Sequence, residues 1–284
     1  MGLFDFLRKG KADSSNEEQM RNYPQMLYAK LLFVDKPELN SQSITNELKL
    51  FYSSVDSSAS ENTLLYFFPD IKVVLAGSQI PAQCTIISPN EDNIKSKIEA
   101  AILQQNWHWD KAAEVVEACK YEVLLSDFMT KGLNYKIRVD LFMNFLAAVT
   151  QVAEPQAIYS VCAEKIISPI DIDDFWGTAE QRTLHGIVNV RLFNISNGEP
   201  GDILMDTIGL HLLGLPDFQI LFNDLDESAV SQLLWNYAYY IYEQGDTIED
   251  GNTLQGLNPG SKWKCERQVA VVAPERIVIH VFPS

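Results

Sequence analysis

The clearest pattern of apolar and polar positions lies between Asp226 and Gly245. Apolar residues recur there at helical spacing, namely at Val230, Leu233, Leu234, Tyr237, Ala238 and Ile241. This spacing follows the 3.6-residue period of a helix that buries one face. Asp226 can accept backbone N–H bonds in the first turn, and Gly245 suits the left-handed residue that ends a helix. The pattern predicts a long amphipathic helix.

Earlier in the chain, apolar runs separated by turn residues predict a series of strands and helices. The expected strands are 26–34, 63–68, 72–76 and 121–126. Two of them, 63–68 and 72–76, are predicted to form a hairpin around Pro69-Asp70. Helices are expected at 43–52 and 133–152, where apolar positions recur at helical intervals.

The segments on either side of the long helix predict strands. Asp217–Phe222 follows the Leu215-Pro216 break and has the composition of a buried strand. Asp206–Gly214 predicts a strand that runs into a short helical turn between two glycines. After the helix, 262–272 and 275–282 predict a closing hairpin around Ala273-Pro274.

This order of elements predicts an α+β fold with mixed or antiparallel sheets and helices on one face. The elements before Asp127 follow the strand–helix–strand–strand–helix–strand order of a ferredoxin-like unit, and a comparable order can be drawn from residue 157 onwards. The hypothesis is therefore two ferredoxin-like α+β halves, at 23–155 and 156–284. A flexible amphipathic tail is expected at 1–22.

Several of these segments also carry a family resemblance. MDTIGLHLLGLPDFQILF (205–222), YYIYEQGDTIEDGNT (239–253) and the WKC at 263–265 resemble the DUF4261 family of bacterial proteins. Ile80-Pro81 and Asn106-Trp107 fit as well, so the likeness extends from about Met26 to the C-terminus and is strongest at 201–265. The family is named for having no assigned function. The resemblance therefore implies the absence of a recognised active site and supplies no catalytic residues.

The charge of the chain narrows its partners. The sequence has 22 basic and 38 acidic residues, a net charge of −16. Such a field repels phosphate backbones, so we expect no nucleic-acid binding. It would suit a basic protein partner, and the alternative is that the acidic surface serves only solubility. The four cysteines have no CxxC spacing and no apolar run approaches the length of a membrane span. We therefore expect a cytoplasmic protein.

The first residues, MGLFDFLRKGK, place apolar side chains beside basic ones. One interpretation of 1–11 is a short helix that makes a weak contact with a membrane surface or a partner. The other is a frayed tail, because so short a helix is marginal alone.

The sequence predicts no catalytic, cofactor or metal site with known spacing: HExxH, GxSxG and Cys/His zinc patterns are absent. One candidate pocket can still be drawn. His211 lies near Asp206 and Asp217 in sequence, and an acid/base pair or mononuclear metal site could form there, although a hydrogen-bonded core histidine is the alternative. Trp107 and His108 could line a ligand pocket or plug a junction between helices.

A candidate recognition surface follows the long helix. Glu243, Asp246, Glu249 and Asp250 lie within eight residues, and Trp263 follows between two lysines. Carboxylates there could attract a cationic group while the indole supplies apolar or cation–π contact. The leading hypothesis is thus a non-enzymatic protein-binding module. The alternative is a small-molecule or metal-dependent enzyme that uses the Asp206, His211 and Asp217 pocket and the acidic turn.

Overall fold

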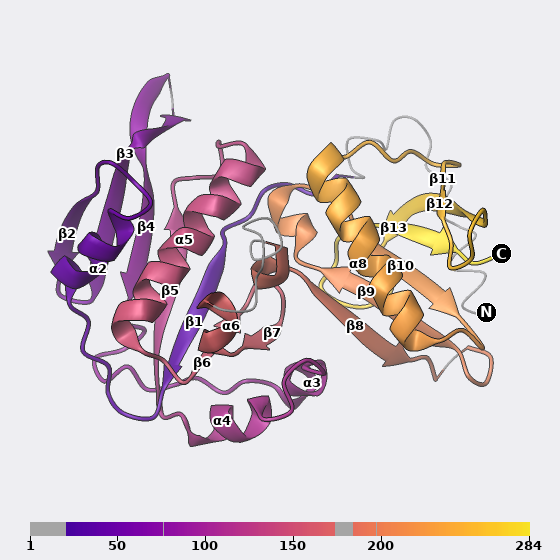
Figure 1. Ribbon diagram of the computed structural model, residues 1–284, viewed down its shortest axis with the longest axis horizontal. Coiled ribbons are helices and arrows are strands. Elements are labelled where there is room, and N and C mark those ends of the chain that lie inside the picture. Colours follow the sequence, from indigo (N-terminus) through magenta and orange to yellow (C-terminus); the bar gives the residue numbers. More distant parts are fainter. Residues whose placement is uncertain (1–20, 76, 174–183, 197) are drawn as a thin grey trace. The chain divides into compact units, whose positions relative to one another are not determined.

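The structure is a computed structural model that describes residues 21–75, 77–173, 184–196 and 198–284. The chain divides into two compact units (Figure 1). One is Met26–Ile187, and the other combines 21–25 with Val188–Ser284. The units therefore separate later than the boundary drawn at 155/156, because the strands that follow residue 156 pair within the first sheet. Most of the predicted tail, and all of 1–11, lies outside the described residues.

The first unit, Met26–Ile187, is built on a seven-stranded sheet. Its strands are β1 (Tyr28–Phe33), β2 (Asp56–Ser60), β3 (Thr63–Leu75), β4 (Ser78–Ile87), β5 (Tyr121–Phe128), β6 (Ala157–Ser160) and β7 (Lys165–Ile167), in the order β2-β3-β4-β5-β1-β6-β7. Its helices are α2 (Ser41–Leu48), α3 (Ala100–Gln104), α4 (Ala112–Ala118), α5 (Tyr135–Ala153) and α6 (Pro169–Asp173).

Helices lie on both faces of this sheet, which adds a layer to the single helical face expected from the sequence. Leu32 on β1 packs with α4 residues such as Val116. Asp127 on β5 is hydrogen-bonded to Arg138 on α5. Leu32 is paired with Glu122, and successive side chains of a strand point to opposite faces, so α4 and α5 cover opposite sides. Helices α2 and α5 pack against each other.

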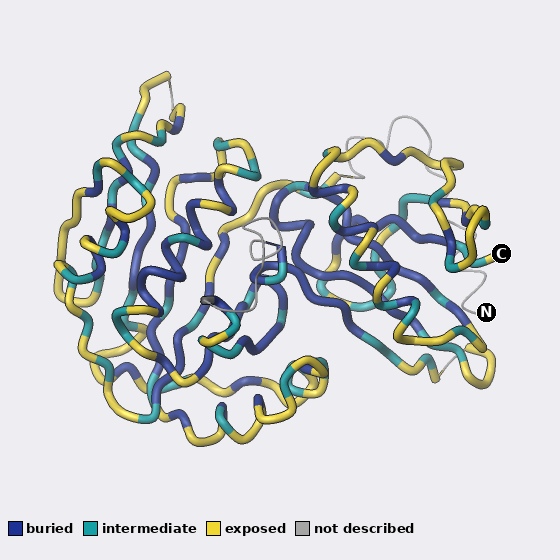
Figure 2. Tube along the Cα trace, in the orientation of Figure 1, coloured by how far each residue is buried: buried dark blue, intermediate teal, exposed yellow. Residues whose placement is uncertain are grey.

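The predicted hairpin around Pro69-Asp70 is wrong. Strand β3 continues through these residues to Leu75, and the β3–β4 turn follows it. The register with β4 shifts between Phe68 and Lys72, so Pro69 and Asp70 lie in a bulge. A proline has no N–H for the ladder, and a bulge accommodates it without ending the strand. The hairpin therefore reaches further than expected, and Figure 2 shows its exposed tip.

The second unit is built on a six-stranded mixed sheet. Its strands are β8 (Asn189–Asn194), β9 (Ile203–Ile208), β10 (Asp217–Phe222), β11 (Thr253–Gln255), β12 (Lys262–Val269) and β13 (Ile277–Phe282), in the order β11-β12-β13-β10-β9-β8. The β10–β13 pair is parallel and the other pairs are antiparallel. The predicted closing hairpin is confirmed as β12–β13.

The predicted long helix is confirmed as α8 (Glu227–Gln244). Asp226 caps it by accepting a hydrogen bond from Ala229 N at 2.7 Å, and Gly245 follows its end with a φ of 79°. Leu234 and Ile241 on its apolar face are fully buried, and the helix packs on β8, β9 and β10. The short helical turn predicted before Gly214 is confirmed as the 3₁₀ helix η2 (Leu210–Leu213).

The predicted α+β class with mixed or antiparallel sheets is confirmed. The ferredoxin-like halves are not. A ferredoxin-like sheet has four strands, and its first strand lies between the third and the fourth. The larger sheet has the order β2-β3-β4-β5-β1-β6-β7, in which β1 lies between β5 and β6, so the strands before Asp127 do not form such a unit.

Candidate functional site

Three residues of the pocket predicted from the sequence converge in the second unit. Asp206 lies on β9, His211 on η2, and Asp217 begins β10, so one strand–turn–strand segment carries all three. His211 Nδ1 lies 2.8 Å from Asp217 Oδ2. Both carboxylates are fully buried and His211 is 5% exposed. The three residues are therefore enclosed in the core and do not line an open cleft.

Two arginines complete this cluster. Arg276, just before β13, donates from Nε to Asp217 Oδ2 at 3.1 Å and from Nη2 to Asp206 Oδ2 at 2.6 Å. Arg191 on β8 donates from Nε and Nη2 to the Asp206 oxygens at 3.0 and 2.6 Å. Other Arg276 N–H groups donate to the carbonyls of Thr207, Val272 and Pro274. Two carboxylates thus face two guanidinium groups in the core.

Asp217 has its hydrogen-bonding capacity occupied. Besides His211 and Arg276, it accepts from Thr207 Oγ1 and from the backbone N–H groups of Leu210 and His211. Burial raises the pKa of Asp217, but the hydrogen bond and charge of His211, with Arg276 and Thr207, outweigh it and hold the pKa below its ordinary value of 3.8. A carboxylate held ionised by so many donors is a poor proton acceptor for a substrate. The cluster is suited to tying β8, β9, β10 and β13 together.

Trp107 and His108 belong to the other unit, in the segment between α3 and α4. The His108 Nε2 atom lies 2.9 Å from the carbonyl oxygen of Ile166 on β7. Trp107 is 46% exposed. The adjacent Asn106 is buried and donates to and accepts from backbone groups of α3 and β7. These contacts fasten the α3–α4 junction to the sheet edge.

The acidic turn after α8 is partly closed by an arginine. Arg267 on β12 forms an ion pair with both carboxylate oxygens of Asp246 and donates to the Ile248 carbonyl. Its backbone N–H donates to Asp250 Oδ1 at 2.6 Å. Glu243 and Glu249 are exposed, whereas Trp263 is only 3% exposed. The indole therefore does not face solvent beside the carboxylates.

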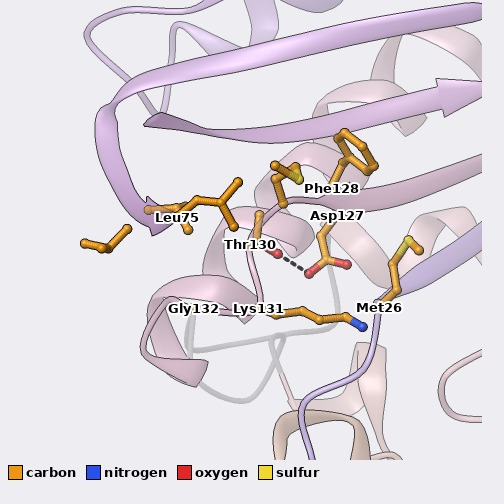
Figure 3. Close-up of a pocket in the computed structure, with 10 residues that line it drawn as sticks. Met26, Leu75, Asp127, Phe128, Thr130, Lys131 and Gly132 are labelled. Carbon is orange, nitrogen blue, oxygen red and sulfur yellow. Dashed lines mark hydrogen bonds between the residues drawn. The ribbon is translucent and has the colours of Figure 1, made fainter. Parts of the chain in front are cut away.

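A cavity that the sequence did not indicate lies in the first unit (Figure 3). It has a volume of about 290 Å³. Its lining comes from the end of β3, the end of β5 and the loop that follows β5, together with one residue before β1: Met26, Val73, Val74, Leu75, Asp127, Phe128, Met129, Thr130, Lys131 and Gly132. We name it the β3–β5 pocket. Gly132 lies against β3: a Cβ there would be 3.5 Å from Val73 Cγ1, an ordinary van der Waals contact.

The rim of the β3–β5 pocket is apolar and open to water. Val74 is 66% exposed, and Met26, Leu75, Phe128 and Met129 are between 36% and 47% exposed. Large side chains of this kind, contiguous around a cavity, mark binding surfaces more often than isolated exposed residues do. Met129 also has a φ of 57°, a left-handed conformation that is costly for a residue with a side chain.

The lining contains one carboxylate, Asp127, and one amino group, Lys131, which differ in whether they are already paired. Asp127 is buried and accepts from Thr130 Oγ1, the bond drawn in Figure 3, and also from Leu27 N and Arg138 Nε, so its charge is neutralised. Lys131 is exposed, and its Nζ has no hydrogen-bond acceptor among the residues that the structure describes. Figure 3 shows its side chain extending in the direction of Met26. The pocket therefore presents one available cation to a ligand.

Three further observations concern metal binding, the cysteines and the helices. Among the described residues, no group of three or more His, Cys, Asp or Glu side chains is placed to hold a metal ion. The four cysteines are buried free thiols. None of the helices within the described ranges is long and apolar enough to cross a membrane.

The fold and these sites define an α+β protein whose second unit is a mixed sheet covered by one long helix and locked by a buried charge cluster. Residues 206–281 of that unit match the family DUF4261, a domain of unknown function, which confirms the resemblance over those residues. The extension of the likeness to Met26 stays a prediction. The match begins at Asp206 and ends one residue after His280, so it includes most of the charge cluster. Neither a curated protein nor a solved structure matches the chain.

Proposed function

We propose that this chain is a non-enzymatic, cytoplasmic protein-binding module that takes up its partner at the β3–β5 pocket. The observation that carries the proposal is the exposed apolar rim around a cavity of about 290 Å³. Burial of apolar surface against a partner contributes a favourable free energy of roughly 25 cal/mol per Å². A bound partner would recover that free energy.

The alternative of an enzyme at Asp206, His211 and Asp217 has less support. These residues are buried, and their oxygens are occupied by arginine, histidine and backbone donors. A general base must reach a substrate proton directly or through one water. The acidic turn stays a secondary candidate surface for a basic group, with Glu249 as an exposed carboxylate.

The experiment compares capture by matched variants. Immobilised protein with Phe128→Asp is compared with the parent chain and with Tyr240→Asp, which alters a similarly exposed aromatic residue on α8. Equal thermal midpoints of the three proteins establish that all are folded. We expect partners retained by the parent and by Tyr240→Asp to be lost from Phe128→Asp. The same set of partners on all three proteins would contradict the proposal.

A further inference from the structure

We infer that the β3–β5 pocket recognises a peptide segment in which one large apolar side chain is followed by a carboxylate. The inference rests on the proposed function and names the chemistry of the partner. The apolar side chain enters the cavity, and the carboxylate pairs with Lys131.

The cavity has room for one large anchoring side chain, and the apolar surface continues beyond it. Pockets that enclose whole small ligands range from about 300 to 1,000 Å³. The β3–β5 pocket, at about 290 Å³, lies at the lower end of that range, and its apolar surface continues onto the exposed rim at Val74 and Leu75, where the rest of a peptide would lie. An apolar anchor inside a cavity, with flanking contacts that exclude water, is the usual arrangement of a peptide or protein interface.

The rim is also adaptable. Met26 and Met129 stand at the opening, and methionine side chains can repack around differently shaped partners. The left-handed backbone at Met129 is a strained conformation of the kind that collects at ligand clamps. It places an exposed thioether at the cavity even though a glycine would adopt this backbone at lower cost.

The charge at the pocket favours a carboxylate beside the apolar anchor of the ligand. Lys131 is the one cation among the ten lining residues, and Asp127, the one carboxylate, is neutralised by Arg138. A single carboxylate next to the anchor is therefore attracted locally. The net charge of −16 repels an anionic membrane or nucleic acid, whose many charges act together. Salt screens charges that lie more than about 8–10 Å apart, so the distant acidic residues act weakly on a ligand carboxylate that contacts Lys131 directly.

The test uses a panel of defined peptides. Acetylated hexapeptides contain Phe followed by Glu, Gln or Lys between glycines, and a fourth contains Ala followed by Glu. Protein labelled with ¹³C at its methionine methyl groups reports binding, because Met26 and Met129 line the pocket and the other four of the six methionines serve as internal references. We expect the Phe-Glu peptide to shift the methyl signals of Met26 and Met129, and the Ala-Glu peptide to leave them unchanged.

The charge preference is tested with variants of Lys131. The Phe-Glu peptide should bind the parent protein roughly two- to fivefold more tightly than the Phe-Gln peptide, the range of an exposed ion pair. Lys131→Gln should remove this difference, and Lys131→Glu should reverse it in favour of the Phe-Lys peptide. Equal affinity for all three Phe peptides would overturn the carboxylate preference while leaving the protein-binding function intact.

Other occupants give different results, each of which overturns the inference. Shifts of the two methyl groups with phosphatidylglycerol vesicles alone would indicate a lipid surface. Shifts on dilution of the protein would indicate a second copy of this chain, and shifts on deletion of residues 1–20 would indicate its own N-terminal segment. If no peptide moves these signals, the peptide assignment fails, and the capture experiment with Phe128→Asp decides the proposed function separately.

Discussion

Replacing Arg276 by methionine tests the buried charge cluster most severely. Methionine keeps the apolar stem but removes the donors that Asp206 and Asp217 receive from the guanidinium group. Removing one partner of a buried ion pair typically costs about 3–5 kcal/mol, because a charge is left without compensation. That is a large part of the roughly 5–15 kcal/mol that holds a domain folded. We expect the second unit to lose about 3–5 kcal/mol of its stability.

Amide hydrogen exchange suits this measurement because it resolves the two units separately. The slowest amides of β9, β10 and β13 should lose protection by about 10²–10³-fold or more, whereas those of β1 and β5 should change little. The difference in protection between the parent and Arg276→Met should become smaller below about pH 4. The pKa of Asp217 is depressed in the folded parent, so its ionised carboxylate stabilises the fold above the ordinary pKa, and this stabilisation is lost as the carboxylate is protonated.

The matched control is Arg267→Met, which breaks a partly exposed ion pair with Asp246. Surface pairs contribute about 0–1 kcal/mol, and the hydrogen bonds that Arg267 donates to the Ile248 carbonyl contribute about 1 kcal/mol, so this variant should lose much less protection than Arg276→Met. Equal and small losses for Arg276→Met and Arg267→Met would refute the conclusion that the cluster holds the sheet together.

Four further predictions follow from single features. Leu234→Ala should cost about 2–5 kcal/mol by chemical denaturation because Leu234 is fully buried, whereas Tyr240→Ala should cost little; equal losses would contradict the packing of α8. Burial lowers the pKa of His280 to about 4. Between about pH 6.5 and 4 this histidine is therefore neutral in the folded state and protonated in the unfolded chain, so the free energy of unfolding should fall as the pH drops through that range. His280→Gln should flatten that slope, by up to about 1.4 kcal/mol per pH unit, and an unchanged slope would count against it. Met129→Gly should leave the thermal midpoint nearly unchanged, since relief of the left-handed backbone offsets the added freedom of the unfolded chain, yet weaken peptide binding. Elemental analysis should find no stoichiometric zinc or iron, and one metal per chain would revive the enzyme alternative.

Sequence reasoning worked best where the signals were local. The α8 helix carries its apolar spacing, its Asp226 cap and its Gly245 terminus within one segment. Asp206 and Asp217 could be associated with His211 because one short strand–turn–strand segment contains all three. Hydrophobic period and capping chemistry can predict features whose residues all lie within one short segment.

The partners that determine the chemistry lie far away in sequence. Arg276 is 59 residues from Asp217 and 70 from Asp206, so nothing local indicated that the carboxylates would be neutralised. Likewise, Asp127 contacts Leu27 across 100 residues, and the β3–β5 pocket forms only where these segments meet. The apolar pair Phe128-Met129, which lies shortly after a predicted strand, was a local signal of this surface. Its neighbours Val73, Val74 and Leu75 could not be associated with it, because the predicted turn at Pro69 ended the first strand of the hairpin too early.

The most direct test of partner binding at the β3–β5 pocket is site-specific photo-cross-linking in cells of the native host. A benzophenone amino acid replaces Phe128 in one variant and Tyr240, similarly exposed on α8, in another. The pocket variant should give a discrete protein adduct, with the cross-link mapping to a partner segment that has an apolar residue beside an Asp or Glu. The Tyr240 variant should not give that adduct. Adducts of equal yield and identity from both positions would contradict binding at the pocket.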